Sequence, residues 1–211
     1  MSTAPRLVVF DLGGVVVRIC RSWAEGCAQA GVEHRPEVER ALAEPAALEL
    51  LDRHQRGGID PAEFFERQSR VLGGGVHAPA ELERVHRAWI LGDYPGIGEA
   101  IDRIHAAGLE TACLSNTNAA HWEQLQESDA FRRIRTRHAS HLLGLAKPDH
   151  AIYRAFERAV GRAPDEVLLF DDLPENVEAA RACGWPAVRI DHRADTAAQV
   201  LAALRERGIH A

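Results

Sequence analysis

The segment Leu7 to Val17, which reads LVVFDLGGVVV, constrains the fold of this 211-residue chain more than any other stretch. Four consecutive apolar residues run into a carboxylate, Asp11, and two glycines follow at once. A short apolar run bounded by a turn signal is typical of a strand that is buried on both faces of a parallel sheet. Open α/β folds place their chemistry at the carboxyl ends of such strands. The segment therefore predicts a central parallel strand that delivers Asp11 to a tight turn.

Asp11 itself has two interpretations. An aspartate after a strand often caps the helix that follows. Here no helix is predicted, because the stretch from Val15 to Ile19 stays largely β-branched and apolar. The pair Gly13 and Gly14 suits close approach of the backbone to a ligand better than it suits helix initiation. The pattern favours a functional carboxylate at position 11.

The second half of the chain alternates between strand and helix patterns. Strands are predicted at 109–114, 134–138, 167–170 and 187–190. Helices are predicted at 97–107, 119–126, 151–160, 174–183 and 196–207. Such alternation predicts a parallel sheet with helices on both faces.

Residues 21 to about 92 follow a different pattern, with apolar residues at helical spacing and breaks at glycine and proline. This pattern predicts four or five short helices and no strand as strong as the first. One helix start is Asp60-Pro61-Ala62-Glu63, with Asp60 as N-cap and Glu63 completing a capping box. The glycine run 73–75 predicts a flexible loop without the lysine of a phosphate-binding P-loop. We predict a doubly wound, Rossmann-like α/β core, residues 1–17 and 93–211, with a helical cap, residues 18–92, inserted into it.

Composition narrows the possible partners. The chain has 25 Lys plus Arg against 31 Asp plus Glu, a net charge of -6, which argues against a general nucleic-acid surface. Its four cysteines lack CxxC spacing and its eleven histidines lack metal-ligand spacing such as HExxH. We expect reduced thiols and solvated or capping histidines. Without a leader pattern or a long apolar run, we expect a soluble, cytoplasmic protein with no membrane partner.

Polar residues stand where several of the predicted core strands end. Each has an ordinary alternative role, because Ser-Asn pairs often cap helices and a lysine before proline is usually a solvated charge. Parallel strands bring their carboxyl ends to one edge, so together the residues predict one site. They are Asp11, Ser115, Asn116, Asp171 and Asp172, joined by Lys147 before a predicted helix.

A phosphate monoester as substrate would give the acidic residues a purpose. Asp11 would attack phosphorus and form an aspartyl phosphate, which splits one slow hydrolysis into two easier steps. Asp171 and Asp172 would be tolerated beside Asp11 only if a cation relieved their repulsion, and carboxylate oxygens suit Mg²⁺.

The remaining site residues would bind the phosphoryl group. Ser115 and the backbone amides near Asn116 would donate hydrogen bonds to its oxygens. Lys147 would neutralise charge on both the phosphate and Asp11. The expected substrate is a small phosphorylated metabolite, and the expected cofactor is Mg²⁺.

Four ordered motifs resemble the signature motifs of the haloacid dehalogenase (HAD) superfamily. They are Phe-Asp-Leu-Gly-Gly at 10–14, Leu-Ser-Asn-Thr-Asn at 114–118, Gly-Leu-Ala-Lys-Pro at 144–148 and Phe-Asp-Asp-Leu-Pro-Glu-Asn at 170–176. The resemblance covers nearly the whole chain, including a helical cap after the first motif. Within the superfamily, the first two motifs and the cap segment Gln-Arg-Gly-Gly-Ile at 55–59 are similar to those of phosphatases of the α-D-glucose-1-phosphate type. This implies a sugar 1-phosphate as substrate.

The chain departs from the superfamily pattern at Gly13. Most phosphatases of the superfamily carry a second aspartate there, which protonates the leaving alcohol, and a missing general acid typically forfeits ~10² to 10⁴ in rate. The resemblance still implies that the backbone carbonyl of Gly13 ligates Mg²⁺.

Three explanations of Gly13 stay open. The first is that the substrate has an acidic leaving group, as in a sugar 1-phosphate. The second is that the protein is a metal-independent 2-haloacid dehalogenase, which would leave Asp171 and Asp172 unexplained. The third is a catalytically silent protein that binds a phosphometabolite.

Overall fold

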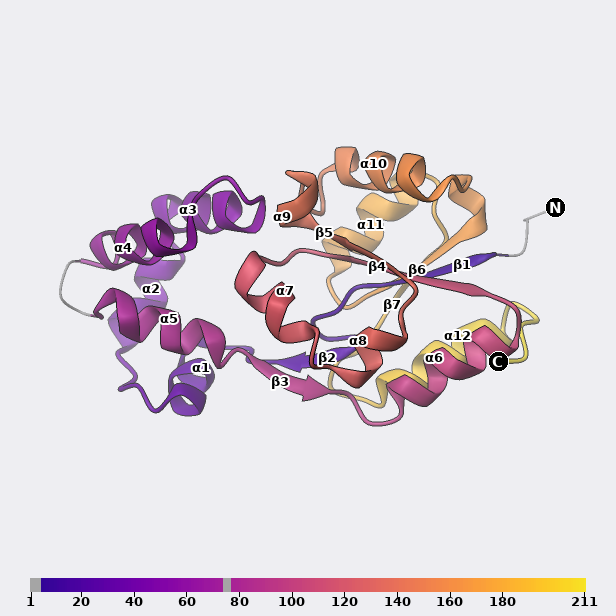
Figure 1. The fold of residues 1–211 in the computed structure, drawn as a ribbon, viewed down its shortest axis with the longest axis horizontal. Coiled ribbons are helices and arrows are strands. Elements are labelled where there is room, and N and C mark those ends of the chain that lie inside the picture. The colour runs from indigo at the N-terminus through magenta and orange to yellow at the C-terminus, as the bar shows by residue number, and fades with distance from the viewer. Residues whose placement is uncertain (1–4, 74–76) are drawn as a thin grey trace.

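A five-stranded parallel sheet organises the computed structural model, which describes residues 5–73 and 77–211 (Figure 1). The strand order is β5-β4-β1-β6-β7, and every pairing is parallel. The strands are β1 Leu7–Phe10, β4 Glu110–Ser115, β5 Thr136–Ala139, β6 Val167–Asp171 and β7 Ala187–Arg189. The chain builds outward from β1 on one side and then on the other, which is the doubly wound order predicted from the sequence. The carboxyl ends of β4, β1 and β6 therefore lie next to one another.

Helices cover both faces of the sheet. Val8 and Phe10 of β1 pack with α6 Ile97–Ala106 and α12 Thr196–Arg205 in one core. Leu7 and Val9 pack in a second core on the opposite face, and Figure 1 shows the two layers on either side of the sheet. The helices of that second layer are α10 His150–Val160 and α11 Pro174–Ala182. Since both faces of β1 are covered, all four of its residues are buried, which explains the uninterrupted apolar run.

The cap helices, α1–α5, form a separate group at the other end of the molecule (Figure 1). They share a core that includes Trp23, Phe64 and Leu82. Their bounds are α1 Trp23–Ala30, α2 Pro36–Leu42, α3 Pro45–Gln55, α4 Pro61–Val71 and α5 Pro79–Arg87. An antiparallel pair, β2 Val17–Ile19 with β3 Ile90–Asp93, connects this group to the sheet domain.

The connecting strands bear on two expectations. The sequence predicted no strand in this region as strong as the first, and the short strand β3 forms here because it pairs with β2, a partner far away in the chain. Both strands run across the predicted domain limits at 17/18 and 92/93. The division into a core, 1–17 and 93–211, and a cap, 18–92, stays a proposal.

The predicted start of α4 is confirmed in part. The Asp60 side chain accepts hydrogen bonds from the backbone N–H groups of Ala62 and Glu63, as an N-cap should. The capping box is wrong, because the Glu63 carboxylate pairs with Arg67 one turn further along the helix. The run 73–75 falls largely outside the described residues.

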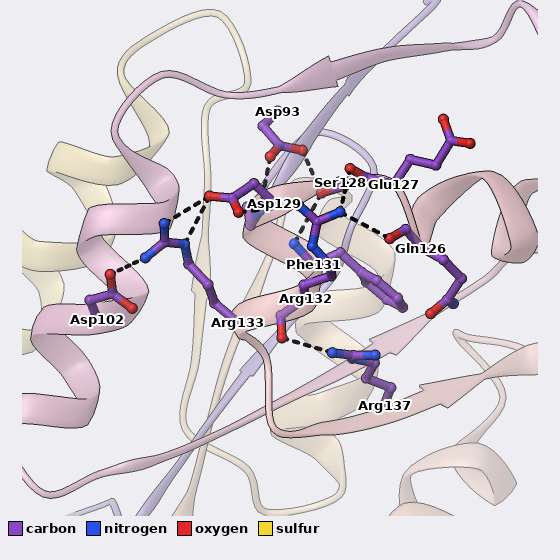
Figure 2. Close-up of polar contacts among 11 residues, drawn as sticks. Asp93, Asp102, Gln126, Glu127, Ser128, Asp129, Phe131, Arg132, Arg133 and Arg137 are labelled. Atoms are coloured by element: carbon purple, nitrogen blue, oxygen red, sulfur yellow. Dashed lines mark hydrogen bonds and ion pairs between the residues drawn. The ribbon is translucent and has the colours of Figure 1, made fainter.

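Three short elements were not predicted: α8 Asp129–Arg133, α9 Ser140–Leu143 and a 3-10 turn, Pro164–Glu166. Figure 2 shows why α8 forms. Ser128 caps it through Phe131 N–H, and Asp93 at the end of β3 accepts from Ser128 Oγ (2.5 Å) and from Ala130 N–H (2.9 Å). Five residues are too few for a periodic signal, and the stabilising partner is distant in sequence.

The remaining predicted elements are present, with ends shifted by at most two residues. They include α7 Ala119–Leu125, which carries Asn118 as its N-cap. All four cysteines are buried and unpaired, in agreement with the expected absence of a disulfide framework. Within residues 5–73 and 77–211, no helix has the length and apolar character needed to cross a membrane.

Candidate active site

Asp11 stands at the end of β1, in the middle of the sheet edge. Its backbone N–H donates to Phe170 O (2.8 Å), and the N–H groups of Val16 and Val17 turn back onto Leu12 O. No helix follows, so Asp11 does not cap one. Its side chain lies among buried groups, with only 7% of the residue exposed.

Gly14 shapes the turn after Asp11. Its φ of 86° lies in the left-handed region, and a Cβ atom at this position would stand 2.3 Å from Asp172 Oδ2. Only glycine therefore lets the turn approach the carboxylates so closely.

Asp171 and Asp172 join Asp11 at this edge. Asp171 ends β6 and Asp172 follows it, and one oxygen from each of the three carboxylates lies within 4.8 Å of the others. Asn176 donates from Nδ2 to both oxygens of Asp171 at 3.1 Å, which fixes that carboxylate. The structure thus brings together the three acidic residues that the sequence predicted as a group.

Lys147 is the first counter-charge in this cluster. Its Nζ donates to Asp11 Oδ1 (2.9 Å) and to Asp171 Oδ2 (2.6 Å), and the residue is 4% exposed. The ordinary interpretation of Lys147 as a solvated charge is therefore wrong. Burial by itself lowers the pKa of Lys147, but attraction to Asp11 and Asp171 outweighs it and raises the pKa above its usual value. Lys147 is a permanent cation here.

Arg21 is a second counter-charge, which the sequence did not predict. Its Nη1 lies 2.8 Å from Asp172 Oδ2, although the two residues are 151 positions apart. His192 Nδ1 stands further away, at 3.7 Å from the same oxygen. No spacing in the sequence signals such a contact.

The charges of this site favour a cation. Asp11, Asp171 and Asp172 carry three negative charges, while Lys147 and Arg21 carry two positive ones, which leaves one negative charge uncompensated. Burial raises the pKa of Asp11 to about 6; Lys147 opposes this rise, and the two neighbouring carboxylates add to it. A divalent cation would relieve that repulsion, and clustered carboxylate oxygens are the donors that Mg²⁺ prefers. The residues present fit such an ion.

Ser115 and Asn116 stand at the carboxyl end of β4, the neighbour of β1 on the side opposite β6. Ser115 ends the strand and is 3% exposed. The Asn116 side chain holds the main chain of Lys147, since Nδ2 donates to Lys147 O (2.7 Å) and Oδ1 accepts from Lys147 N–H (2.8 Å). These contacts position Lys147, and they leave the backbone amide of Asn116, rather than its side chain, as the candidate phosphate donor.

The family model of haloacid dehalogenase-like hydrolases matches residues 5–184. The chain belongs to this family. Among curated relatives, a protein named phosphatase MT3486 from Mycobacterium tuberculosis is 29% identical over 204 residues, covering 90% of this chain and 88% of the relative. Mouse acyl-CoA dehydrogenase family member 10 is 27% identical over 219 residues. That match covers 97% of this chain but only 20% of the mouse protein.

Solved structures agree on the fold of this HAD-like hydrolase. A predicted HAD-like family hydrolase from Porphyromonas gingivalis has a TM-score of 0.78 at 23% identity, covering 96% of this chain and 99% of that one. A HAD family enzyme from Bacteroides thetaiotaomicron, solved as a complex with magnesium and inorganic phosphate, has a TM-score of 0.73 at 20% identity. That alignment covers 91% of this chain and 97% of the Bacteroides enzyme.

The histidines of this HAD-like hydrolase are less solvated than expected. His54 is 3% exposed and stacks on Phe64 at a ring distance of 4.0 Å. It is therefore not a solvated group. His86 of α5 and His121 of α7 stack at 3.9 Å, where the cap helices meet the sheet domain. Asn118 caps α7, since its Oδ1 accepts a hydrogen bond from His121 N–H (3.1 Å).

The buried His54 makes the stability of this hydrolase depend on pH. Burial, reinforced by His121 and His141, lowers the pKa of His54 to about 4. The unfolded chain binds a proton on this residue below its ordinary pKa of about 6.5, whereas the folded chain does not until about pH 4. We therefore expect the contribution of neutral His54 to the free energy of unfolding to be fully present above pH 6.5. As the pH drops from 6.5 to 4, the free energy of unfolding should fall by up to about 3 kcal/mol.

Urea unfolding at pH 7.0 and pH 5.0 measures this loss. The variant His54→Phe keeps a ring on Phe64 but cannot titrate, so we expect it to lose less stability than the wild type over this interval. Equal losses in both proteins would show that other groups control the pH dependence.

Proposed function

We propose that this HAD-like hydrolase is a Mg²⁺-dependent phosphatase that cleaves a small phosphorylated metabolite through an aspartyl phosphate on Asp11. The observation that carries the proposal is the uncompensated negative charge of three buried carboxylates beside two fixed cations. The phosphatase name of the Mycobacterium relative, and the magnesium and phosphate in the Bacteroides enzyme, support it. The test is phosphate release from p-nitrophenyl phosphate with and without Mg²⁺, with Asp11→Asn as the blank.

In this proposal Asp11 is the nucleophile. One of its oxygens would bond to phosphorus while the ester oxygen departs with the P–O bonding electrons as the alcoholate, which then takes a proton from water. A second water would cleave the acyl phosphate, giving inorganic phosphate and restoring the Asp11 carboxylate. Mg²⁺ would be held by Asp11, Asp171, Asp172 and the backbone carbonyl of Gly13, and it would supply positive charge against the phosphoryl oxygens.

Other residues of the chain would stabilise the charge that develops on the phosphoryl group. Lys147 already contacts Asp11 at 2.9 Å, and its raised pKa would keep it cationic at neutral pH. Ser115 Oγ and the amide of Asn116 would donate to the phosphoryl oxygens from the end of β4. Asn116 would also keep the main chain of Lys147 in place through its two side-chain hydrogen bonds.

Gly13 restricts the leaving group. No side chain at position 13 can protonate the departing oxygen, so the alcohol must be acidic enough to leave without help. A sugar 1-phosphate meets this condition, because an anomeric hydroxyl is more acidic than an ordinary sugar hydroxyl. A sugar 1-phosphate is therefore one candidate among the phosphate esters with an acidic leaving group.

The variant Gly13→Asp tests whether the lack of a general acid at position 13 limits the hydrolysis of esters with poor leaving groups. Gly13 has no positive φ, and a Cβ there would meet only the flexible end of Ile19, at 3.0 Å, so a side chain can be accommodated. We expect kcat/KM for an alkyl phosphate such as glucose 6-phosphate to rise by about 10-fold to 10²-fold. The gain on p-nitrophenyl phosphate should be smaller, because p-nitrophenol needs little protonation.

Gly13→Asn is the matched control for this prediction, because it has nearly the same shape but no ionisable proton. It should give no gain on either substrate. An equal gain for Asn and Asp, or a larger gain on p-nitrophenyl phosphate than on glucose 6-phosphate, would contradict the explanation.

A further inference from the structure

The leaving alcohol would lie in a cavity of about 380 Å³ between the sheet domain and the cap helices. Gly13, Ser115 and Asn116 line one end of it, so the cavity opens directly beside the candidate nucleophile. The other end is lined from α1, α3, α4 and α5. This volume lies within the range of small-molecule sites, about 300 to 1,000 Å³. It is much larger than a phosphoryl group requires.

The walls of the cavity are mainly apolar. Aromatic rings come from Trp23, Phe64 and Trp89, and aliphatic side chains include Ile19 and Leu82. Among the described residues that line it, none is an aspartate, glutamate, lysine or arginine. A substrate that carried a second anionic group would find no cation there.

Hydrogen-bonding groups away from the phosphate end are few. His121 is already engaged, because Nε2 donates to His86 O (2.7 Å) and Nδ1 meets Asn118 Nδ2 (3.3 Å). Burial lowers the pKa of both His86 and His121, so neither ring supplies a positive charge. The remaining polar groups include the Gln55 and Gln68 amides.

A sugar fits these walls poorly. Each hydroxyl that loses its water without gaining a partner lowers affinity by roughly ten-fold. An aromatic ring fits them well, because it buries a large apolar area and stacks on neighbouring rings. A phenol also has a pKa of about 10, against about 15.7 for water, so a phenolate leaves without the acid that Gly13 lacks. The apolar walls and Gly13 thus point to the same kind of leaving group.

Resting on the proposed function, we propose that the substrates are aryl phosphates, meaning phosphate monoesters of phenolic or similarly apolar aromatic alcohols with no second anionic group. The apolar cavity would hold the aromatic ring. The phosphoryl group would lie toward Asp11 and Lys147.

The first experiment compares kcat/KM of the wild type with Mg²⁺ for four esters. Phenyl phosphate and 2-naphthyl phosphate have leaving groups of similar acidity but different apolar area. We expect 2-naphthyl phosphate to exceed phenyl phosphate by about ten-fold and to exceed glucose 1-phosphate and phosphoglycolate by about 10²-fold or more.

A pair of variants on α3 tests whether the lack of a positively charged side chain in the cavity wall excludes substrates with a second anionic group. Leu51 lines the cavity and is 37% exposed, so Leu51→Lys adds a charge at the wall without burying it fully. We expect kcat/KM for phosphoglycolate to rise by about ten-fold and that for 2-naphthyl phosphate to fall. Leu48 lies on the same helix, is 51% exposed and is not part of the cavity, so Leu48→Lys should behave as the wild type.

The outcomes separate the two proposals. If p-nitrophenyl phosphate is hydrolysed with Mg²⁺ but glucose 1-phosphate matches or exceeds 2-naphthyl phosphate, the aryl assignment is overturned and the phosphatase assignment stands. If phenyl and 2-naphthyl phosphate are turned over equally, the apolar cavity does not select the alcohol and the aryl assignment is again overturned. If no ester is hydrolysed with any divalent cation, both proposals are overturned.

Discussion

Asp11→Asn is expected to remove phosphate release altogether, with kcat at least ~10⁴-fold below the wild type. The amide keeps the shape of the side chain but cannot attack phosphorus to form the acyl phosphate. The substitution also lowers the negative charge beside Lys147 and Asp171, so it should not unfold the protein. The measurement is single-turnover and steady-state release of phosphate from p-nitrophenyl phosphate.

A matched control is Asp102→Asn on α6. Asp102 is an exposed carboxylate that pairs with Arg133 (Figure 2). It should keep wild-type kcat. Residual activity of Asp11→Asn within ten-fold of the wild type would rule out Asp11 as the nucleophile.

Removal of divalent cations is the second large effect. With EDTA, phosphate release should fall to the level of the Asp11→Asn variant, and added Mg²⁺ should restore it. Ca²⁺ should restore it poorly, because it prefers more ligands at longer distances. The physical reason is the excess negative charge of Asp11, Asp171 and Asp172, which the two cations in contact with them, Lys147 and Arg21, do not neutralise completely.

Thermal unfolding gives an independent readout of this metal dependence. Mg²⁺ should raise Tm of the wild type and raise that of Asp172→Asn less, because binding only to the folded state stabilises it. Halide release from a 2-haloacid in the presence of EDTA would instead indicate a metal-independent dehalogenase. A Mg²⁺-dependent rise in Tm without turnover of any ester would indicate a silent phosphometabolite-binding protein.

The sheet, and the edge of it that carries the candidate site, could be predicted because their sequence signals are local. β1 and β6 are buried on both faces, so each is an unbroken apolar run that ends in a carboxylate. The order of alternating strands and helices then places Asp11, Ser115 and Asp171 on neighbouring strands.

The features that escaped prediction depend on contacts between distant segments. Arg21 gains its role only because the turn at Gly14 brings Asp172 against it. β3 needs β2, and α8 needs Asp93. Asn116 was predicted to bind substrate, but its side-chain partners became visible only when β4 and the Lys147 segment were placed side by side.

Contacts between distant segments also determine which side chains of the cap helices line the cavity, and the sequence pattern did not predict them. Its helices followed from apolar spacing, yet spacing does not reveal which side chains face a shared cavity. Trp23, Phe64 and Trp89 come from different elements and converge there. The interior position of His54 likewise depends on the packing of α3 on α4.

The two adjacent glycines after Asp11 differ sharply in how much they can be altered by protein engineering. Position 14 is closed to every side chain, because a Cβ would stand 2.3 Å from Asp172 Oδ2. Position 13, one peptide unit away, meets only the end of Ile19 at 3.0 Å. A designer who wishes to broaden the repertoire of this enzyme toward less reactive esters therefore has one permissive position, Gly13, beside the proposed nucleophile. A library that randomises both glycines would lose most of its members at Gly14.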